Sequence, residues 1–151
     1  MKLFRLARAR HAKDLDGVGA KLYPGRWNSL DVPMIYCAES IAQCVVEVVV
    51  HHEESPDDYC AVELTVPDNA PVLKPSVAKL PKSWMDEDYN PATRAVGDAF
   101  IGGKYLLMRV PSATVEGAYN YLINPAHPDL KQVKVVSVKP FTFDKRLFKK
   151  K

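Results

Sequence analysis

The sequence predicts an α+β fold, because the segments typical of strands outnumber those typical of helices and the two kinds do not alternate regularly. Prolines end several of the apolar runs, which keeps them at strand length. The length of 151 residues fits one domain, 1–151, that can bury most of the apolar surface of its unfolded chain. We therefore expect a single core without internal repeats.

The N-terminal part contains two expected strands separated by a long irregular segment. Residues 2–8 (KLFRLAR) alternate imperfectly between apolar and basic side chains, as in a half-exposed strand. Residues 34–38 form a short apolar run after Pro33, which predicts a buried strand. Three of the seven glycines lie between these strands. A loop of this composition usually approaches a ligand or another backbone closely.

Two signals disagree over residues 40–52, SIAQCVVEVVVHH. The valine run favours a strand, whereas Ser40 followed three residues later by Gln43 is the capping box that begins a helix. Thirteen residues without Gly or Pro exceed the usual length of a strand, so a helix is predicted. Because this helix is apolar nearly all round, we expect it to be mostly buried, with Glu47 in its middle.

The remaining chain contains three further expected strands and a second helix. Residues 59–66 alternate between apolar and polar side chains, and residues 105–110 and 133–138 are apolar runs. A helix is expected over residues 91–101, since a proline at its first position and two glycines after its last are start and stop signals.

Composition is that of a soluble globular protein, with 47% hydrophobic and 26% charged residues. No apolar run approaches the roughly 20 residues of a membrane helix, and arginines interrupt the only candidate for a signal-peptide core. We therefore expect a cytoplasmic protein that does not bind membranes. The three cysteines lack the paired spacing of a zinc site, which predicts reduced, buried thiols.

The basic character of the chain comes from its C-terminal tail, residues 145–151. The net charge is +3, from 21 basic and 18 acidic residues, and five of the basic residues lie in these last seven positions. Without them the count is 16 basic against 18 acidic residues, or −2. We expect a solvated tail, and a domain with no bias towards nucleic-acid binding.

Four side chains are candidates for chemistry, and each also has an ordinary structural interpretation. Glu47 lies among valines, where a carboxylate is costly to bury unless it pairs with a cation or serves a ligand. Arg26 offers a planar fork for phosphate oxygens, or it pairs with a neighbour such as Asp31. Tyr36 stacks on a flat ligand or belongs to the core. Ser112 donates to a ligand or caps a turn.

Standard metal and phosphate motifs are absent from the sequence. The run His51-His52-Glu53-Glu54 lacks the HExxH spacing, and adjacent residues on a helix do not face one another, so no metal site is expected. Neither GxGxxG nor GxxxxGK[ST] occurs.

Together these residues form a pattern that resembles RES-domain proteins, a family named for arginine, glutamate and serine. The resemblance begins at LFRLA, continues through DGVGAKLYPGRWNSLDVPMIYCAESIAQCVVEVVVH, and resumes at VGDAF, LLMRVPSATV, NYLINPAHPD and FTFDKRLF. GRWN, a tyrosine ten residues after its arginine and a glutamate eleven residues beyond are a specific combination. One departure is Pro24-Gly25 before the arginine, where family members commonly have two glycines. Residues 68–90 carry little family signal.

The resemblance implies an ADP-ribosyltransferase-like fold, in which two mostly antiparallel β-sheets flanked by helices surround a cleft that binds NAD. It places Glu47, Arg26 and Tyr36 in catalysis, and it places Arg26, Tyr36, Ser112 and, as a weaker candidate, Asn124 in NAD binding. Glu47 would stabilise the oxocarbenium-like state that forms as the nicotinamide-ribose bond breaks. Arg26 would bind the pyrophosphate. For Asn124 a loop-stabilising role is preferred.

The resemblance further implies the toxin of a type II toxin-antitoxin system, which depletes NAD by hydrolysis or phosphorolysis. Its partner would be an Xre-type antitoxin with a helix-turn-helix DNA-binding domain. NAD would be the substrate, with no metal or other cofactor, and a homodimer within the complex is compatible with the family. Protein mono-ADP-ribosylation, a non-catalytic NAD-binding module and an RNA-targeting toxin that uses the basic tail are alternatives.

Overall fold

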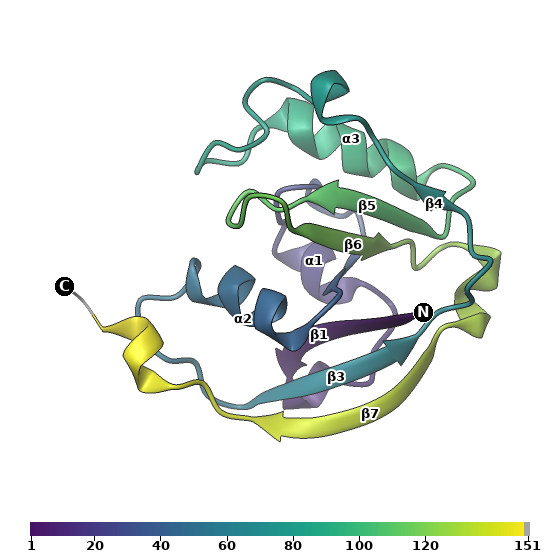
Figure 1. Ribbon diagram of the computed structural model, residues 1–151. Coiled ribbons are helices and arrows are strands. Elements are labelled where there is room, and N and C mark those ends of the chain that lie inside the picture. Colours follow the sequence, from purple (N-terminus) through teal and green to yellow (C-terminus); the bar gives the residue numbers. More distant parts are fainter. Residues whose placement is uncertain (150–151) are drawn as a thin grey trace.

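Seven strands form one sheet in the computed structural model, which describes residues 1–149 (Figure 1). The strands are β1 (Lys2–Arg8), β2 (Ile35–Ala38), β3 (Tyr59–Thr65), β4 (Val72–Leu73), β5 (Leu107–Pro111), β6 (Tyr119–Ile123) and β7 (Lys134–Phe141). Their order is β4-β5-β6-β2-β1-β3-β7. Neighbouring strands are antiparallel, apart from the parallel pair β4–β5.

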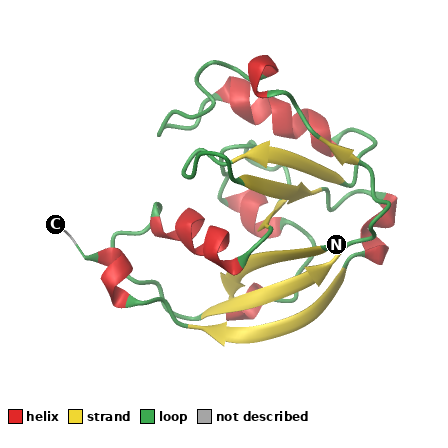
Figure 2. Cartoon of the chain, in the orientation of Figure 1, coloured by secondary structure: helices red, strands yellow, loops and turns green. Residues whose placement is uncertain are grey.

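Helices and single turns connect these strands (Figure 2). The α-helices of the described residues are α1 (Val18–Leu22), α2 (Ile41–Val49) and α3 (Pro91–Ile101). Short 3₁₀ helices are η1 (Ala9–His11), η2 (Val77–Lys79), η3 (Pro128–Gln132) and η4 (Lys145–Phe148). The α+β class is thus confirmed.

The expectation of two separate sheets is corrected, because hydrogen bonds connect all seven strands. The connection between β1 and β2 is narrow, since the register of this pair consists of Phe4 opposite Ala38. By comparison, β1 pairs with β3 along its whole length. The strands β4, β5 and β6 therefore lie apart from β1, β3 and β7, with α2 between the two groups in Figure 1.

Both faces of the sheet are covered at β5 and β6, so these two strands bury apolar side chains on both sides. In β5, Leu107 packs into one core cluster and the next residue, Met108, packs into the other. The same alternation occurs in β6 at Leu122 and Ile123. Because successive side chains of a strand point to opposite faces, an apolar run such as this one indicates burial on both sides.

α2 begins where the capping box predicts it, but it is less buried than expected. The backbone N–H of Gln43 donates to Ser40 Oγ at 3.1 Å, which satisfies one of the unpaired donors of the first turn. This start outweighs the strand preference of the valine run. Of residues 41–49 only Cys44 is buried. The expectation of a mostly buried helix is wrong, because α2 lies along the edge of an open cleft.

α3 confirms the signals that the sequence contains. Asn90 caps it by accepting the backbone N–H of Thr93 at 2.9 Å, Pro91 occupies the first position, and the helix ends before Gly102. Strand β6 was not expected, although its residues YNYLI are rich in β-formers between Gly117 and Pro125.

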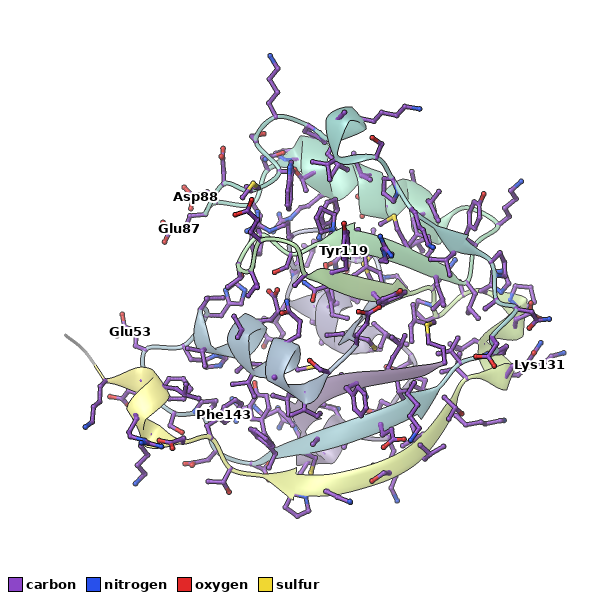
Figure 3. The ribbon with its side chains drawn as sticks, viewed as in Figure 1. Glu53, Glu87, Asp88, Tyr119, Lys131 and Phe143 are labelled. Atoms are coloured by element: carbon purple, nitrogen blue, oxygen red, sulfur yellow. The ribbon has the colours of Figure 1, made fainter. Side chains whose placement is uncertain are left out.

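The cysteines are free and buried, as predicted. The C-terminal tail is more ordered than expected, because residues 145–148 form η4 and Phe148 packs edge-on against Phe143 at 5.8 Å between ring centroids. Figure 3 shows Phe143 beside this turn. Residues 150–151 of the predicted tail lie outside the described residues. No helix of the described chain has the length and apolar character needed to cross a membrane.

Candidate active site

A cleft of about 990 Å³ opens where β1 and β2 diverge. Its lining comes from both strands, from one side of α2 and from the loops at residues 23–27 and 85–89. In Figure 3, Glu87 and Asp88 lie above Glu53 on the same side of the molecule. Three of the predicted residues, Arg26, Tyr36 and Glu47, line this cleft although they are separated in sequence.

Glu47 stands at the centre of a hydrogen-bond network. Its Oε1 accepts from Gln43 Nε2 at 2.9 Å, from Ser112 Oγ at 2.7 Å and from Asn120 Nδ2 at 2.9 Å. Its Oε2 lies 3.4 Å from Thr114 Oγ1, at the limit of a hydrogen bond. The carboxylate is therefore held by neutral donors rather than by the arginine ion pair that the sequence also allowed.

Ser112 is buried and its hydroxyl has one available direction for its proton. Ser112 Oγ accepts the backbone N–H groups of Thr114 at 3.1 Å and Val115 at 3.0 Å. Because these two donors occupy its lone pairs, the hydroxyl must donate its own proton, and Glu47 Oε1 is the acceptor. Ser112 thus acts on Glu47 and does not itself line the cleft.

Arg26 is anchored to the loop that precedes α3. Its Nη1 donates to the backbone oxygens of Trp84 at 2.6 Å and Asp86 at 2.7 Å, and its guanidinium lies 5.0 Å from the centre of the Tyr89 ring. A guanidinium has five N–H groups, and both hydrogen bonds use Nη1. Within residues 1–149 the rest of the fork has no hydrogen-bond partner and can bind a ligand in the cleft.

Tyr36 stabilises the loop that carries Arg26. Its hydroxyl donates to Asn28 Oδ1 at 2.7 Å and accepts the backbone N–H of Trp27 at 3.1 Å. A side chain at Gly25 would come within 2.8 Å of this hydroxyl, so glycine is required by the close approach. Burial raises the pKa of Tyr36, which keeps the phenol protonated.

α3 fixes the same loop from the opposite side. Arg94 Nε donates to the oxygen of Gly25 at 3.2 Å. Asp98 accepts from the backbone N–H of Ser29 at 2.9 Å and from its hydroxyl at 2.6 Å. These contacts come from residues four apart on one helix face, which the loop covers.

Asn124 does not belong to the cleft lining. It is buried, donates through Nδ2 to the oxygen of Ile101 at 3.0 Å and accepts the backbone N–H of Ala126 at 2.9 Å. These contacts fit the loop-stabilising role that was preferred from sequence, and we leave Asn124 out of the proposed site.

His51 and Tyr89 join the two sides of the cleft. The Tyr89 hydroxyl lies 3.0 Å from His51 Nε2. Burial lowers the pKa of His51, against the opposite effect of the Glu47 charge. His52 Nδ1 lies 2.9 Å from the oxygen of Val48, so the two histidines point to different partners. No group of three or more metal-ligating side chains occurs among residues 1–149.

Sequence reasoning missed several residues that build the site. Asn120 lay within the quoted NYLINPAHPD segment, but strand β6 that places it beside Glu47 was not recognised. Gln43 was considered only as half of a capping box, although its spacing of four from Glu47 puts both on one helix face. Asn28 belongs to the quoted GRWN motif but was given no role, and Tyr89 lies in the segment 68–90 that carries little family signal.

Comparison with known proteins agrees with this geometry. The RES domain family matches residues 2–144. This chain belongs to the RES domain family. A Sphingobium sp. protein described as "Prs ADP-ribosylating toxin" is 37% identical, in a match that covers 95% of this chain and 92% of that protein. "Toxin Res" of Pseudomonas putida is 34% identical, with 89% and 93% covered.

Another "Toxin Res", from Photorhabdus laumondii, is 31% identical to this RES domain protein over 100% of this chain and 99% of that protein. Among solved structures, a chain of the M. tuberculosis MbcT-MbcA toxin-antitoxin complex superposes with a TM-score of 0.75 at 23% identity, covering 93% of this chain and 84% of that chain. This chain therefore shares the fold of that chain.

Proposed function

We propose that this RES domain protein is a toxin that cleaves the nicotinamide-ribose bond of NAD. The observation that carries the proposal is Glu47, a carboxylate on the wall of the cleft. Its Oε1 accepts three hydrogen bonds, whereas its Oε2 has, among the described residues, one donor at 3.4 Å. Bond cleavage gives the electron pair to the nicotinamide nitrogen and leaves positive charge on the ribose. A fixed carboxylate beside that charge lowers the barrier.

The other predicted residues serve binding in this proposal. Arg26 faces the cleft with a guanidinium fork that suits pyrophosphate oxygens, and Tyr36 packs against the nicotinamide-ribose end while it supports the Arg26 loop. Ser112 acts through Glu47. The partner is an Xre-type antitoxin with a helix-turn-helix domain, as the family resemblance implies.

The acceptor of the ADP-ribosyl group is water, phosphate or a protein side chain. In each case the acceptor oxygen or nitrogen forms a bond to the ribose carbon as the bond to nicotinamide breaks. Water, a hydroxyl or an amine then releases a proton, whereas an ionised phosphate or carboxylate oxygen has none to release. The Sphingobium relative is named for ADP-ribosylation of Prs, so transfer to a protein is the second candidate function. The likeness to its sequence extends over 95% of this chain.

The deciding experiment is nicotinamide release from NAD labelled in its adenylate half. We expect release by the wild type and a loss of at least about 100-fold in Glu47→Gln, which keeps the shape of the side chain and removes its charge. Glu54→Gln makes the same change at an exposed position outside the cleft lining and serves as the control.

The fate of the label identifies the acceptor. Free ADP-ribose indicates water, a phosphorylated ADP-ribose that requires added phosphate indicates phosphorolysis, and label that stays on protein indicates transfer. If a folded wild-type protein leaves NAD intact with all three acceptors present, the proposal is wrong and a non-catalytic binding module takes its place.

A further inference from the structure

The amide groups of Gln43 and Asn120 give the Glu47 carboxylate two unlike oxygens. Oε1 accepts from both amides and from Ser112 Oγ, all between 2.7 and 2.9 Å. A carboxylate has about four lone-pair sites on its two oxygens, so three donors exhaust Oε1. Oε2 lies next to Thr114, an exposed residue of the cleft lining.

The orientation of the amides is itself determined. Gln43 Nε2 also lies 3.3 Å from Asn120 Oδ1, so the oxygen of Asn120 faces Gln43 and its NH₂ group faces Glu47. Gln43 comes from the first turns of α2 and Asn120 from β6, so the triangle connects the helix to the sheet. A partial rotation of Glu47 about its last torsion would break three hydrogen bonds at once, whereas a half-turn exchanges two equivalent oxygens and leaves the arrangement the same.

We propose that Gln43 and Asn120 are positioning residues, which hold Glu47 so that Oε1 stays bound to the protein and Oε2 faces the substrate. The inference rests on the proposed function for its meaning in catalysis. The amides supply neutral donors, so they orient the carboxylate without cancelling the charge that the transition state needs. An arginine or lysine in their place would hold Glu47 equally well but would oppose positive charge on the ribose.

The first test removes each donor with little change in shape, in Gln43→Met and Asn120→Leu. We expect kcat for nicotinamide release to fall about tenfold in each variant, because one hydrogen bond to a charged group is lost, while KM changes less than about twofold. A KM increase at constant kcat would instead mean that the amide binds NAD directly, and it would overturn the positioning role.

The second test uses Gln43→Glu, which places a second carboxylate beside Glu47. Like charges raise the pKa of a carboxyl group, so the acid limb of the kcat profile should move to higher pH by about one unit. Gln132→Glu adds the same charge in η3, where its parent residue donates to Asp129, and should leave the limb in place. Lys131, the residue before Gln132, lies on the opposite side of the molecule from Glu87, which belongs to the cleft lining (Figure 3). If the limb stays in place in Gln43→Glu, residue 43 does not contact the Glu47 carboxylate in solution, and the positioning role is overturned.

A titration of the Glu47 carboxyl by NMR, without NAD, separates the two proposals. If the wild type releases no nicotinamide, the function fails, and the titration still decides whether the amides act on Glu47. A higher Glu47 pKa in Asn120→Leu and Gln43→Met supports positioning, since donors to the charged form are gone. An unchanged titration in both variants overturns it, whatever the activity.

Discussion

Some side chains that line the cleft also stabilise the backbone around it, and Tyr36 is the clearest case. The family resemblance places it beside NAD, yet its hydroxyl already has two partners within the protein, Asn28 Oδ1 and the backbone N–H of Trp27. Asn28 is fully buried and donates in turn to the oxygens of Ala20 and Val32. The tyrosine therefore determines the shape of the arginine loop before any ligand arrives.

Tyr36→Phe should lower the free energy of unfolding by about 1–3 kcal/mol, because the Trp27 N–H loses its acceptor and Asn28 Oδ1 loses a donor within a buried site. Urea unfolding of the purified variant measures this change. Tyr23→Phe is the matched control, since Tyr23 is 83% exposed, and it should shift the midpoint very little. Equal stability of Tyr36→Phe and the wild type would limit Tyr36 to ligand contact.

The placement of α3 against the arginine loop depends on a glycine. An added Cβ at Gly97 would lie 1.7 Å from the backbone oxygen of Trp27, a distance at which the backbone itself must move. The neighbouring contacts from Arg94 and Asp98 to the loop are possible only at this close approach. The contacts with α3 therefore determine the conformation of the loop on either side of Trp27.

Gly97→Ala should destabilise the protein by about 3 kcal/mol, although the same change in an exposed helix interior stabilises by about 1 kcal/mol. Thermal unfolding measures the difference. Gly102→Ala is the control at the end of the same helix, where the nearest atom to the new Cβ is 3.8 Å away. Equal melting temperatures of the two variants would show that the loop adapts, and nicotinamide release by Gly97→Ala should then be normal.

For the molecule as a whole, burial of all three cysteines makes thiol chemistry a reporter of global unfolding. Cys37, Cys44 and Cys60 are 4%, 7% and 7% exposed. Burial raises the pKa of Cys37 to about 12, and burial together with the Glu47 charge raises the pKa of Cys44 to about 12. An unfolded thiol has a pKa of about 8.5, and only the thiolate reacts.

We expect no thiol of the folded protein to react with Ellman's reagent at pH 8 in the time that the guanidinium-unfolded chain reacts completely. The raised pKa values also determine whether the folded state gains or loses stability as the pH rises. Between about pH 8.5 and about 12 the unfolded thiols lose protons that the folded Cys37 and Cys44 retain, so these groups make the folded state less stable as pH rises. Rapid modification of one thiol in the native protein would contradict this view of the interior.

Local signals in the sequence were sufficient for elements whose ends are determined by caps and prolines. α3 follows from Pro91 and the glycines after its last residue, and the start of α2 follows from Ser40, because such start and stop signals act on the backbone within one turn. β6 and β4 were missed, since short strands are stabilised by neighbours that are distant in the chain. The burial of α2 was overestimated for the same reason, because composition does not reveal which face of a helix has a partner.

The sequence by itself determined the fold class, the family pattern and the chemical types that occupy the cleft, because these depend on local periodicity and on residue identity. Tertiary structure decided how those types work together. Only the pairing of β6 with β2 brings Asn120 to Glu47, and only the narrow contact of β1 with β2 opens the cleft. Such relations depend on hydrogen bonds between segments that are distant in the sequence, and Asn120 and Glu47, for example, are separated by 73 positions, which no local pattern encodes.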